Sequence, residues 1–175
     1  MKRWLLWLPF LGFVLLFGIV TFGLKAPTDR TVKSAMVGKP LPDFTLPAIV
    51  PGKPGLSSAD FAPGKPRLLN VFASWCLPCI AEAPQLMALK QAGVEIDAVA
   101  VRDTPWALRD FLARNGDPYA RIGDDKQSSV QLSIGSSGVP ETFLIDAQGR
   151  IIEQHIGDIR ADDVPDILAK LRAAR

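Results

Sequence analysis

The sequence predicts an α/β domain in which a central mixed sheet carries helices on both faces, preceded by one transmembrane helix. Two apolar runs, 67–74 and 95–102, are typical of buried parallel strands. Residues 80–93, between them, have helical spacing, which predicts a β-α-β unit with a right-handed crossover. Near the amino terminus, residues 4–24 carry no charge. As a helix they would span roughly 31 Å, about one bilayer core.

The remaining patterns complete the predicted domain. Thr104 and Pro105 suit the N-cap and first position of a helix that ends near Arg114. Residues 141–157 have the pattern of two strands joined by a turn, and 161–175 form an amphipathic helix. Weaker patterns favour a strand at 43–50, a short strand at 119–125 and a short helix at 126–135.

The chain is predicted to consist of a membrane anchor at 1–25, a polar linker at 26–42 and a domain at 43–175. Lys2 and Arg3 precede the apolar segment, so the positive-inside rule keeps that end in the cytoplasm. In a bacterium the domain then faces the periplasm, where disulfides form and persist. A cleaved secretory signal is the alternative. Because its apolar region would run to only ~7–15 residues, a retained single-pass anchor is favoured.

Composition narrows the function further. At 175 residues the chain can hold about one domain. Apart from Lys2 and Arg3, its basic and acidic residues are equal in number, and no basic stripe is present in the sequence. This balance argues against a nucleic-acid-binding protein.

Both cysteines, Cys76 and Cys79, lie in the segment FASWCLPCIAEAP. A zinc site needs about four ligands, or three and a water, and the chain adds only His155 to the two cysteines. A purely structural disulfide is disfavoured because so small a loop gains little from lost chain entropy. Among these three interpretations, a redox-active dithiol without metal or cofactor is favoured, and His155 is assigned no role.

The cysteine pair is predicted to lie at the carboxyl end of strand 67–74, where the next helix begins. A helix N-terminus presents unpaired N–H groups and a partial positive charge. These would stabilise a thiolate at Cys76, which is therefore predicted to attack the substrate disulfide. Cys79, one helical turn later, would resolve the mixed disulfide. Trp75 is expected either to cover the dithiol or to belong to the core.

The segments NVFASWCLPCIAEAP, VGKPLPDFTLPAI and GVPETFLIDAQGRI together resemble the CcmG/DsbE family of membrane-anchored thiol:disulfide oxidoreductases, which is close to TlpA and ResA. The resemblance covers most of residues 37–172 and implies a thioredoxin fold with an extra N-terminal hairpin. It implies a reductant for the CxxCH disulfide of apocytochrome c, or of a haem-ligation partner, during cytochrome c biogenesis. It also implies re-reduction by a membrane dithiol carrier of the DsbD or CcdA type.

The resemblance also assigns residues to the site around the redox-active pair Cys76 and Cys79. Pro140 matches the cis-proline that faces the dithiol in thioredoxin folds, and the backbone of Val139 would then pair with an extended substrate. Trp75 would contact the substrate beside the dithiol.

Two carboxylates, Glu82 and Glu141, match acidic positions of the family and are expected to tune the dithiol and relay protons. The alternatives are an exposed first-turn helix residue for Glu82 and a solvated strand-end charge for Glu141. Leu77 and Pro78 depart from the Pro-Thr that the family often has between its cysteines, which affects partner choice more than chemistry.

Two other functions stay open. One is a general TlpA-like periplasmic reductase for other metalloprotein assembly, and the other is a non-catalytic module that binds apocytochrome. An oxidant resembling DsbA is disfavoured by the anchor and the two carboxylates. A peroxiredoxin needs a lone cysteine in a Thr-x-x-Cys setting, which the sequence ASWC does not provide.

Overall fold

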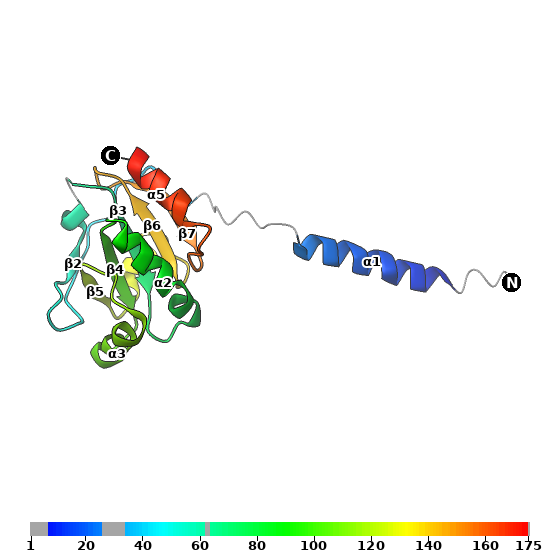
Figure 1. The fold of residues 1–175 in the computed structure, drawn as a ribbon, viewed down its shortest axis with the longest axis horizontal. Coiled ribbons are helices and arrows are strands. Elements are labelled where there is room, and N and C mark those ends of the chain that lie inside the picture. Colours follow the sequence, from blue (N-terminus) through cyan, green and yellow to red (C-terminus); the bar gives the residue numbers. More distant parts are fainter. Residues whose placement is uncertain (1–6, 26–33, 62–63, 175) are drawn as a thin grey trace. The chain divides into compact units, whose positions relative to one another are not determined.

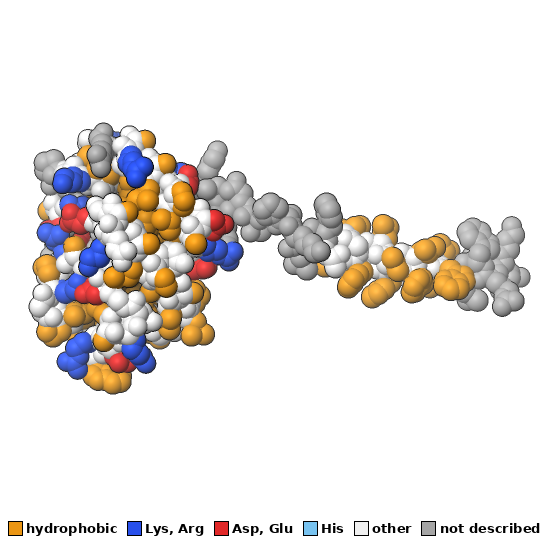
Figure 2. Space-filling model, viewed as in Figure 1, with side chains coloured by type: hydrophobic (Ala, Val, Ile, Leu, Met, Phe, Trp, Pro, Cys, Tyr) orange, Lys and Arg blue, Asp and Glu red, His pale blue; other side chains and the backbone are white. Residues whose placement is uncertain are grey.

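The computed structural model describes residues 7–25, 34–61 and 64–174 (Figure 1). In the N-terminal unit, helix α1 spans Leu8–Lys25, and its side chains as far as Val20 are exposed. Figure 2 shows hydrophobic side chains along this helix. Among the described residues, no helix combines the length and the apolar content that a membrane crossing requires. The transmembrane helix expected within 1–25 is not confirmed and stays a prediction.

The folded domain is built on a five-stranded mixed sheet with the order β5-β4-β3-β6-β7. The central β3 pairs in parallel with β4, and β4 pairs in parallel with β5. β6 runs antiparallel to β3, and β7 runs antiparallel to β6. The predicted mixed sheet is thereby confirmed. The strands are β3 (Arg67–Phe72), β4 (Ile96–Val101), β5 (Ile122–Asp125), β6 (Glu141–Ile145) and β7 (Ile151–Ile156).

Helices cover both faces of this sheet, as predicted. The cluster on one face contains side chains of α2 (Leu77–Gln91), α3 (Pro105–Asn115) and α5 (Val164–Ala173). In Figure 1, α2 and α5 lie over the strands. The cluster on the other face contains side chains of the short α4 (Ser129–Ser133) and of the N-terminal hairpin. The apolar sheet is therefore buried on both sides, which explains its nearly continuous apolar strands.

The N-terminal hairpin consists of β1 (Thr45–Leu46) and β2 (Leu56–Ser57), which pair antiparallel, and the 3₁₀-helix η2 (Ser58–Phe61) follows. The strand predicted over 43–50 is thus only two residues long. Pro47 has no N–H group to continue the ladder.

The connection between β1 and β2 lies against strand β5. The N–H of Asp124 donates to the carbonyl of Pro47 at 2.9 Å. The two segments are close at Gly123, where a Cβ would lie 2.7 Å from the Cβ of Leu46. A side chain at position 123 would therefore push the hairpin off the sheet.

The segment before the hairpin lies against strand β7. The N–H of Gly38 donates to the carbonyl of Ile151 at 2.7 Å, and the N–H of Ile151 donates to the carbonyl of Lys39 at 2.9 Å. The later part of the predicted linker 26–42 is therefore paired with the sheet. Its earlier part, 26–33, lies outside the described residues.

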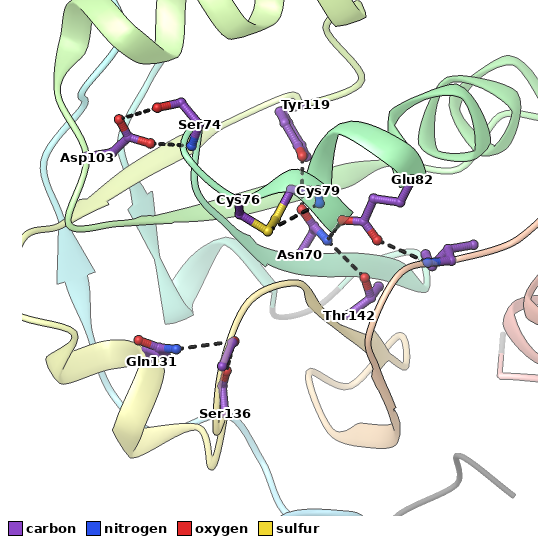
Figure 3. Close-up of a disulfide and its surroundings, with 12 residues drawn as sticks. Asn70, Ser74, Cys76, Cys79, Glu82, Asp103, Tyr119, Gln131, Ser136 and Thr142 are labelled. Carbon is purple, nitrogen blue, oxygen red and sulfur yellow. Dashed lines mark hydrogen bonds between the residues drawn. A yellow bond between two sulfur atoms is a disulfide. The ribbon is translucent and has the colours of Figure 1, made fainter. Parts of the chain in front are cut away.

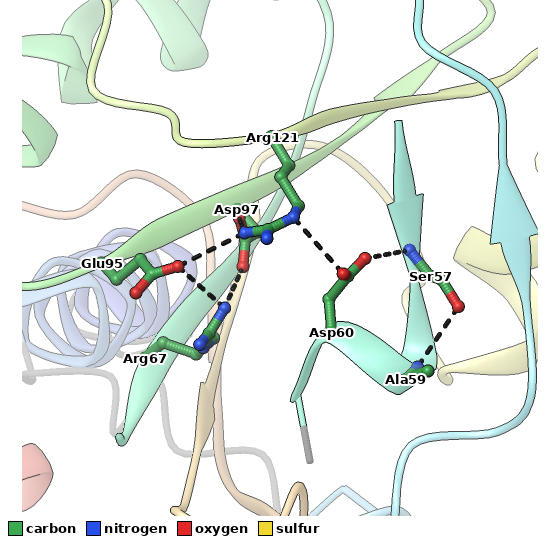
Figure 4. Close-up of polar contacts among 7 residues, drawn as sticks. All are labelled: Ser57, Ala59, Asp60, Arg67, Glu95, Asp97 and Arg121. Atoms are coloured by element: carbon green, nitrogen blue, oxygen red, sulfur yellow. Dashed lines mark hydrogen bonds and ion pairs between the residues drawn. The ribbon is translucent and has the colours of Figure 1, made fainter. Parts of the chain in front are cut away.

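A network of charged side chains joins the amino ends of β3 and β4 to η2 (Figure 4). Arg67 Nη1 donates to Asp97 Oδ2 at 3.0 Å and to Glu95 Oε1 at 2.9 Å. Arg121 Nε lies 3.4 Å from Asp60 Oδ1. Burial raises the pKa of Asp97, although its bond to Arg67 opposes this. The network lies at the end of β3 opposite the cysteine pair.

Candidate active site

The two cysteines lie where β3 ends and α2 begins, as the sequence predicts, and they form a disulfide with a Cα–Cα distance of 5.3 Å. Cys76 is the N-cap of α2, and its Sγ accepts a hydrogen bond from the N–H of Cys79 at 3.2 Å. Because this cap and Pro78 start the helix, α2 begins at Leu77, earlier than the predicted 80–93. A thiolate at Cys76 would accept a hydrogen bond from the same N–H group, which would stabilise its negative charge.

Glu82 lies one turn beyond Cys79 on α2 and is fully buried (Figure 3). Its Oε1 accepts a hydrogen bond from Asn70 Nδ2 at 3.0 Å, and its Oε2 accepts one from the N–H of Ile159 at 3.2 Å. The alternative of an exposed helix residue is therefore wrong. The carboxyl group is held by two donors inside the core that surrounds the dithiol.

Burial raises the pKa of Glu82 from 4.5 to about 7, and the negative charge of Asp158 adds to the rise. The hydrogen bonds from Ile159 and Asn70 stabilise the carboxylate and oppose it. The net effect leaves Glu82 able both to take up and to release a proton near neutral pH. General acid–base catalysis requires this property of a side chain.

A Glu82→Gln variant is expected to remove much of the pH dependence of folding. Because the folded pKa of about 7 exceeds the ordinary 4.5, the carboxyl group favours folding fully below about pH 4.5. This contribution falls as the pH rises through 7, by about 3 kcal/mol in the free energy of unfolding. Urea unfolding of the oxidised chain at pH 5 and pH 8 measures it.

The control for this experiment is Asp110→Asn, which removes an exposed carboxylate and should leave the wild-type pH dependence intact. The oxidised form is used because disulfide-bonded cysteines do not titrate. If wild type and Glu82→Gln lose stability equally between pH 5 and pH 8, the assignment of the raised pKa to Glu82 is wrong.

Glu141 is also fully buried, so the alternative of a solvated charge is wrong. Its Oε1 accepts hydrogen bonds from the N–H of Ser137 at 2.9 Å and of Gly138 at 3.0 Å, and its Oε2 accepts one from Gln154 Nε2 at 2.6 Å. Glu141 thus holds the loop that leads into Pro140. Its predicted redox-tuning role is not tested by these contacts.

The two carboxylates lie on opposite faces of the sheet. Thr142 pairs with Asn70 in the β3–β6 register, and both belong to the network of Glu82. Glu141 precedes Thr142 in the same strand, and successive side chains in a strand point to opposite faces. Glu82 therefore belongs to the face covered by α2, and Glu141 to the opposite face.

The loop before β6 borders the dithiol. The Val139–Pro140 peptide bond is cis, and Val139 packs against the cluster that includes both cysteines. Trp75 and Val139 line one surface pocket of about 250 Å³, together with Leu132 and Arg102. Trp75 is 60% exposed, which excludes the core interpretation, and its Nε1 donates to the carbonyl of Arg102 at 3.3 Å. Substrate contact by these residues stays a prediction.

Three polar residues of the site, Asn70, Tyr119 and Asp103, were not predicted from the sequence. Asp103 accepts hydrogen bonds from the N–H of Ser74 at 2.6 Å and from its Oγ at 2.8 Å, so it holds the residue before Trp75. Asn70 was detectable in principle, because a polar residue inside an apolar strand must find partners. The local sequence carries no signal for Tyr119.

Comparison with known proteins agrees with this geometry. The chain matches the Redoxin family over residues 36–171. It is 38% identical to the thiol:disulfide interchange protein HelX of Rhodobacter capsulatus over 162 residues, 93% of this chain and 92% of the relative. It is 34% identical to DsbE of Escherichia coli over 165 residues, 91% of this chain and 88% of the relative.

Comparison with solved structures also places the chain among thiol:disulfide interchange proteins. A thiol:disulfide interchange protein of the thioredoxin family from Chlorobium tepidum superposes with a TM-score of 0.61 at 25% identity, covering 77% of this chain and 94% of that one. The domain therefore has a thioredoxin-like fold. With this fold, a disulfide at the start of α2 and relatives of this similarity, the chain belongs to the Redoxin family and, within it, to the DsbE/HelX thiol:disulfide interchange proteins.

Proposed function

We propose that the protein is a thiol:disulfide oxidoreductase that works as a reductant. The observation that carries this proposal is the pairing of a disulfide at a helix N-terminus with a buried carboxyl group of pKa about 7 one turn further on. A carboxyl group of this kind beside a dithiol disfavours the thiolate form of a neighbouring cysteine. A dithiol with little thiolate character is the better electron donor.

The proposed reaction transfers two electrons from the reduced dithiol. The Cys76 thiolate attacks one sulfur of the substrate disulfide, which forms a mixed disulfide and expels the other substrate sulfur as a thiolate that takes up a proton. The Glu82 carboxylate then accepts the proton of the Cys79 thiol. The Cys79 thiolate attacks the Cys76 sulfur, which expels the second substrate sulfur as a thiolate and leaves the Cys76–Cys79 disulfide. This second thiolate takes up a proton, and Glu82 releases the proton it had accepted.

The substrate we propose is the CxxCH disulfide of apocytochrome c, or of a haem-ligation partner. Membership of the DsbE/HelX group and the resemblance to CcmG support it. The substrate segment would lie along Val139 and Pro140 and contact Trp75, which border the dithiol on one side. A membrane dithiol carrier of the DsbD or CcdA type would return the electrons.

We further propose that the domain works at the periplasmic face of the bacterial inner membrane, held by residues 1–25. The uncharged run 4–24 and the preceding Lys2 and Arg3 support this arrangement. The side chains of α1 as far as Val20 are apolar apart from two glycines, and they are exposed.

The experiment that tests this proposal is the reduction potential of the full chain, equilibrated with dithiothreitol or glutathione buffers. A reductant is expected to lie between about −200 and −270 mV, or lower. A value near −120 mV, the potential of the oxidant DsbA, would overturn the proposal. The control is the double variant Cys76→Ala/Cys79→Ala, which should show no redox transition.

A further inference from the structure

We propose that Asn70 and Tyr119 are positioning residues that set the orientation and protonation of Glu82, and through it the exchange reaction at Cys79. The inference rests on the proposed function, because it concerns the proton relay of Glu82. Asn70 lies in β3 and Tyr119 in the loop before β5. Among the described residues, neither is hydrogen-bonded to a cysteine sulfur.

The geometry begins with Asn70, which is fully buried in β3 six positions before Cys76. Its amide nitrogen donates to Glu82 Oε1 and to Thr142 Oγ1, each at 3.0 Å. Its amide oxygen accepts a hydrogen bond from the hydroxyl of Tyr119 at 2.9 Å (Figure 3). All three partners come from different parts of the chain, and the amide is saturated on its nitrogen side.

The hydroxyl of Tyr119 decides which end of this amide faces Glu82. Turning the Asn70 amide over would present its oxygen to Glu82 and its nitrogen to Tyr119. The buried phenol proton of Tyr119 would then lose its acceptor, which is costly away from water. With Tyr119 in place, the amide therefore presents N–H groups to Glu82, and these favour the carboxylate over the acid.

Tyr119 keeps this donor role at all physiological pH values. Burial, with help from the charge of Glu82, raises its pKa well above 10, so the phenol stays protonated. Its ring packs on Phe72 with centroids 4.6 Å apart, and only 3% of the residue is exposed. A Tyr119→Phe substitution would keep this ring packing while removing the hydroxyl alone.

The titratable groups that act on Glu82 come from several elements. Asp158, in the loop after β7, raises its pKa by repulsion, and Tyr119 faces it across Asn70. Cys79 is its neighbour one turn earlier on α2. Tyr119 and Asn70 are uncharged, so substituting them changes the hydrogen bonds around Glu82 without changing any charge.

The test uses the full chain with ¹³C-labelled glutamate, in which side-chain resonances follow the protonation of Glu82 in the oxidised protein. The resonance is assigned with Glu82→Gln. In Tyr119→Phe the amide of Asn70 is free to turn, so that its oxygen accepts a hydrogen bond from the protonated carboxyl group of Glu82. The titration midpoint is therefore expected to rise by about 0.5 to 1 pH unit above the wild-type value.

Tyr119→Phe is also expected to raise the pH midpoint of the disulfide-reduction rate by a similar amount. Asn70→Ala, which removes the donor itself, is the second variant and should also raise the midpoint. Phe111→Leu is the control, because it loosens the packing against Phe72 without touching any hydrogen bond of the network, and it should leave the midpoint in place.

A midpoint that stays unchanged or falls in both Tyr119→Phe and Asn70→Ala, in folded protein, would overturn the inference. The proposed function fails separately. If the midpoint rises but the reduction potential of the wild-type chain is that of an oxidant, the positioning role stands and the reductant role does not.

Discussion

Cys76→Ser is expected to lose disulfide exchange by about a thousandfold or more, because the attacking sulfur is gone and a serine hydroxyl is not ionised at the helix N-terminus. Cys79→Ser is expected to keep the first attack and then stop. Its Cys76 would remain joined to the substrate, since the chain then has no second sulfur of its own to resolve the mixed disulfide. Stopped-flow reduction of a CxxCH peptide disulfide measures the rates, and non-reducing mass spectrometry identifies the joined species.

Comparing Cys76→Ser with Cys79→Ser decides which cysteine attacks the substrate. A substrate captured through Cys79 in the Cys76→Ser variant, at the wild-type rate, would reverse the two roles. If the double variant Cys76→Ala/Cys79→Ala still supports cytochrome c assembly in cells, the protein acts as a non-catalytic binding module. Both cysteines are nearly buried in the oxidised chain, Cys76 4% and Cys79 2% exposed.

Arg67→Met is expected to lower the free energy of unfolding by about 3 to 5 kcal/mol at pH 7, the largest loss of stability among the variants discussed. The substitution keeps the apolar stem but removes the cation that faces Asp97, whose carboxylate is fully buried. Arg121 remains 3.7 Å from Asp97 but is too distant for a good hydrogen bond. Urea unfolding of the oxidised chain measures the loss.

Two further variants separate the cost of leaving Asp97 without its cation from the cost of losing any one charge. Arg114→Met breaks an exposed ion pair with Asp110 and should cost less than about 1 kcal/mol. Arg67→Met/Asp97→Asn removes both buried charges and should recover part of the stability lost in the single variant. The interpretation is wrong if Arg67→Met and Arg114→Met cost the same.

The order of the elements and the position of the dithiol were predictable because they depend on local signals. The apolar runs of β3 and β4, and the N-cap formed by Thr104, each need only neighbouring residues to be recognised. The N-terminal hairpin was less well predicted. Its strands are two residues long, and they depend on packing against β5, which no local pattern records.

The polar part of the site depends on contacts between distant residues. Tyr119 is 49 residues from Asn70 in the chain, and Thr142 is 72 residues from it. Glu82 and Glu141 were both expected to act on the dithiol because both match acidic positions of a family. Placing them on opposite faces requires the register of β3 with β6, which only the folded sheet supplies.

The stretch of chain before β3 has a consequence for the behaviour of the domain at high concentration. Residues between β1 and β2 hydrogen-bond to β5, and the segment at Gly38 and Lys39 hydrogen-bonds to β7, so each outer strand already has a partner. Exposed outer strands are templates for pairing with another chain and for aggregation. With both borders occupied, copies of the domain at high concentration are expected to stay separate rather than join their sheets edge to edge.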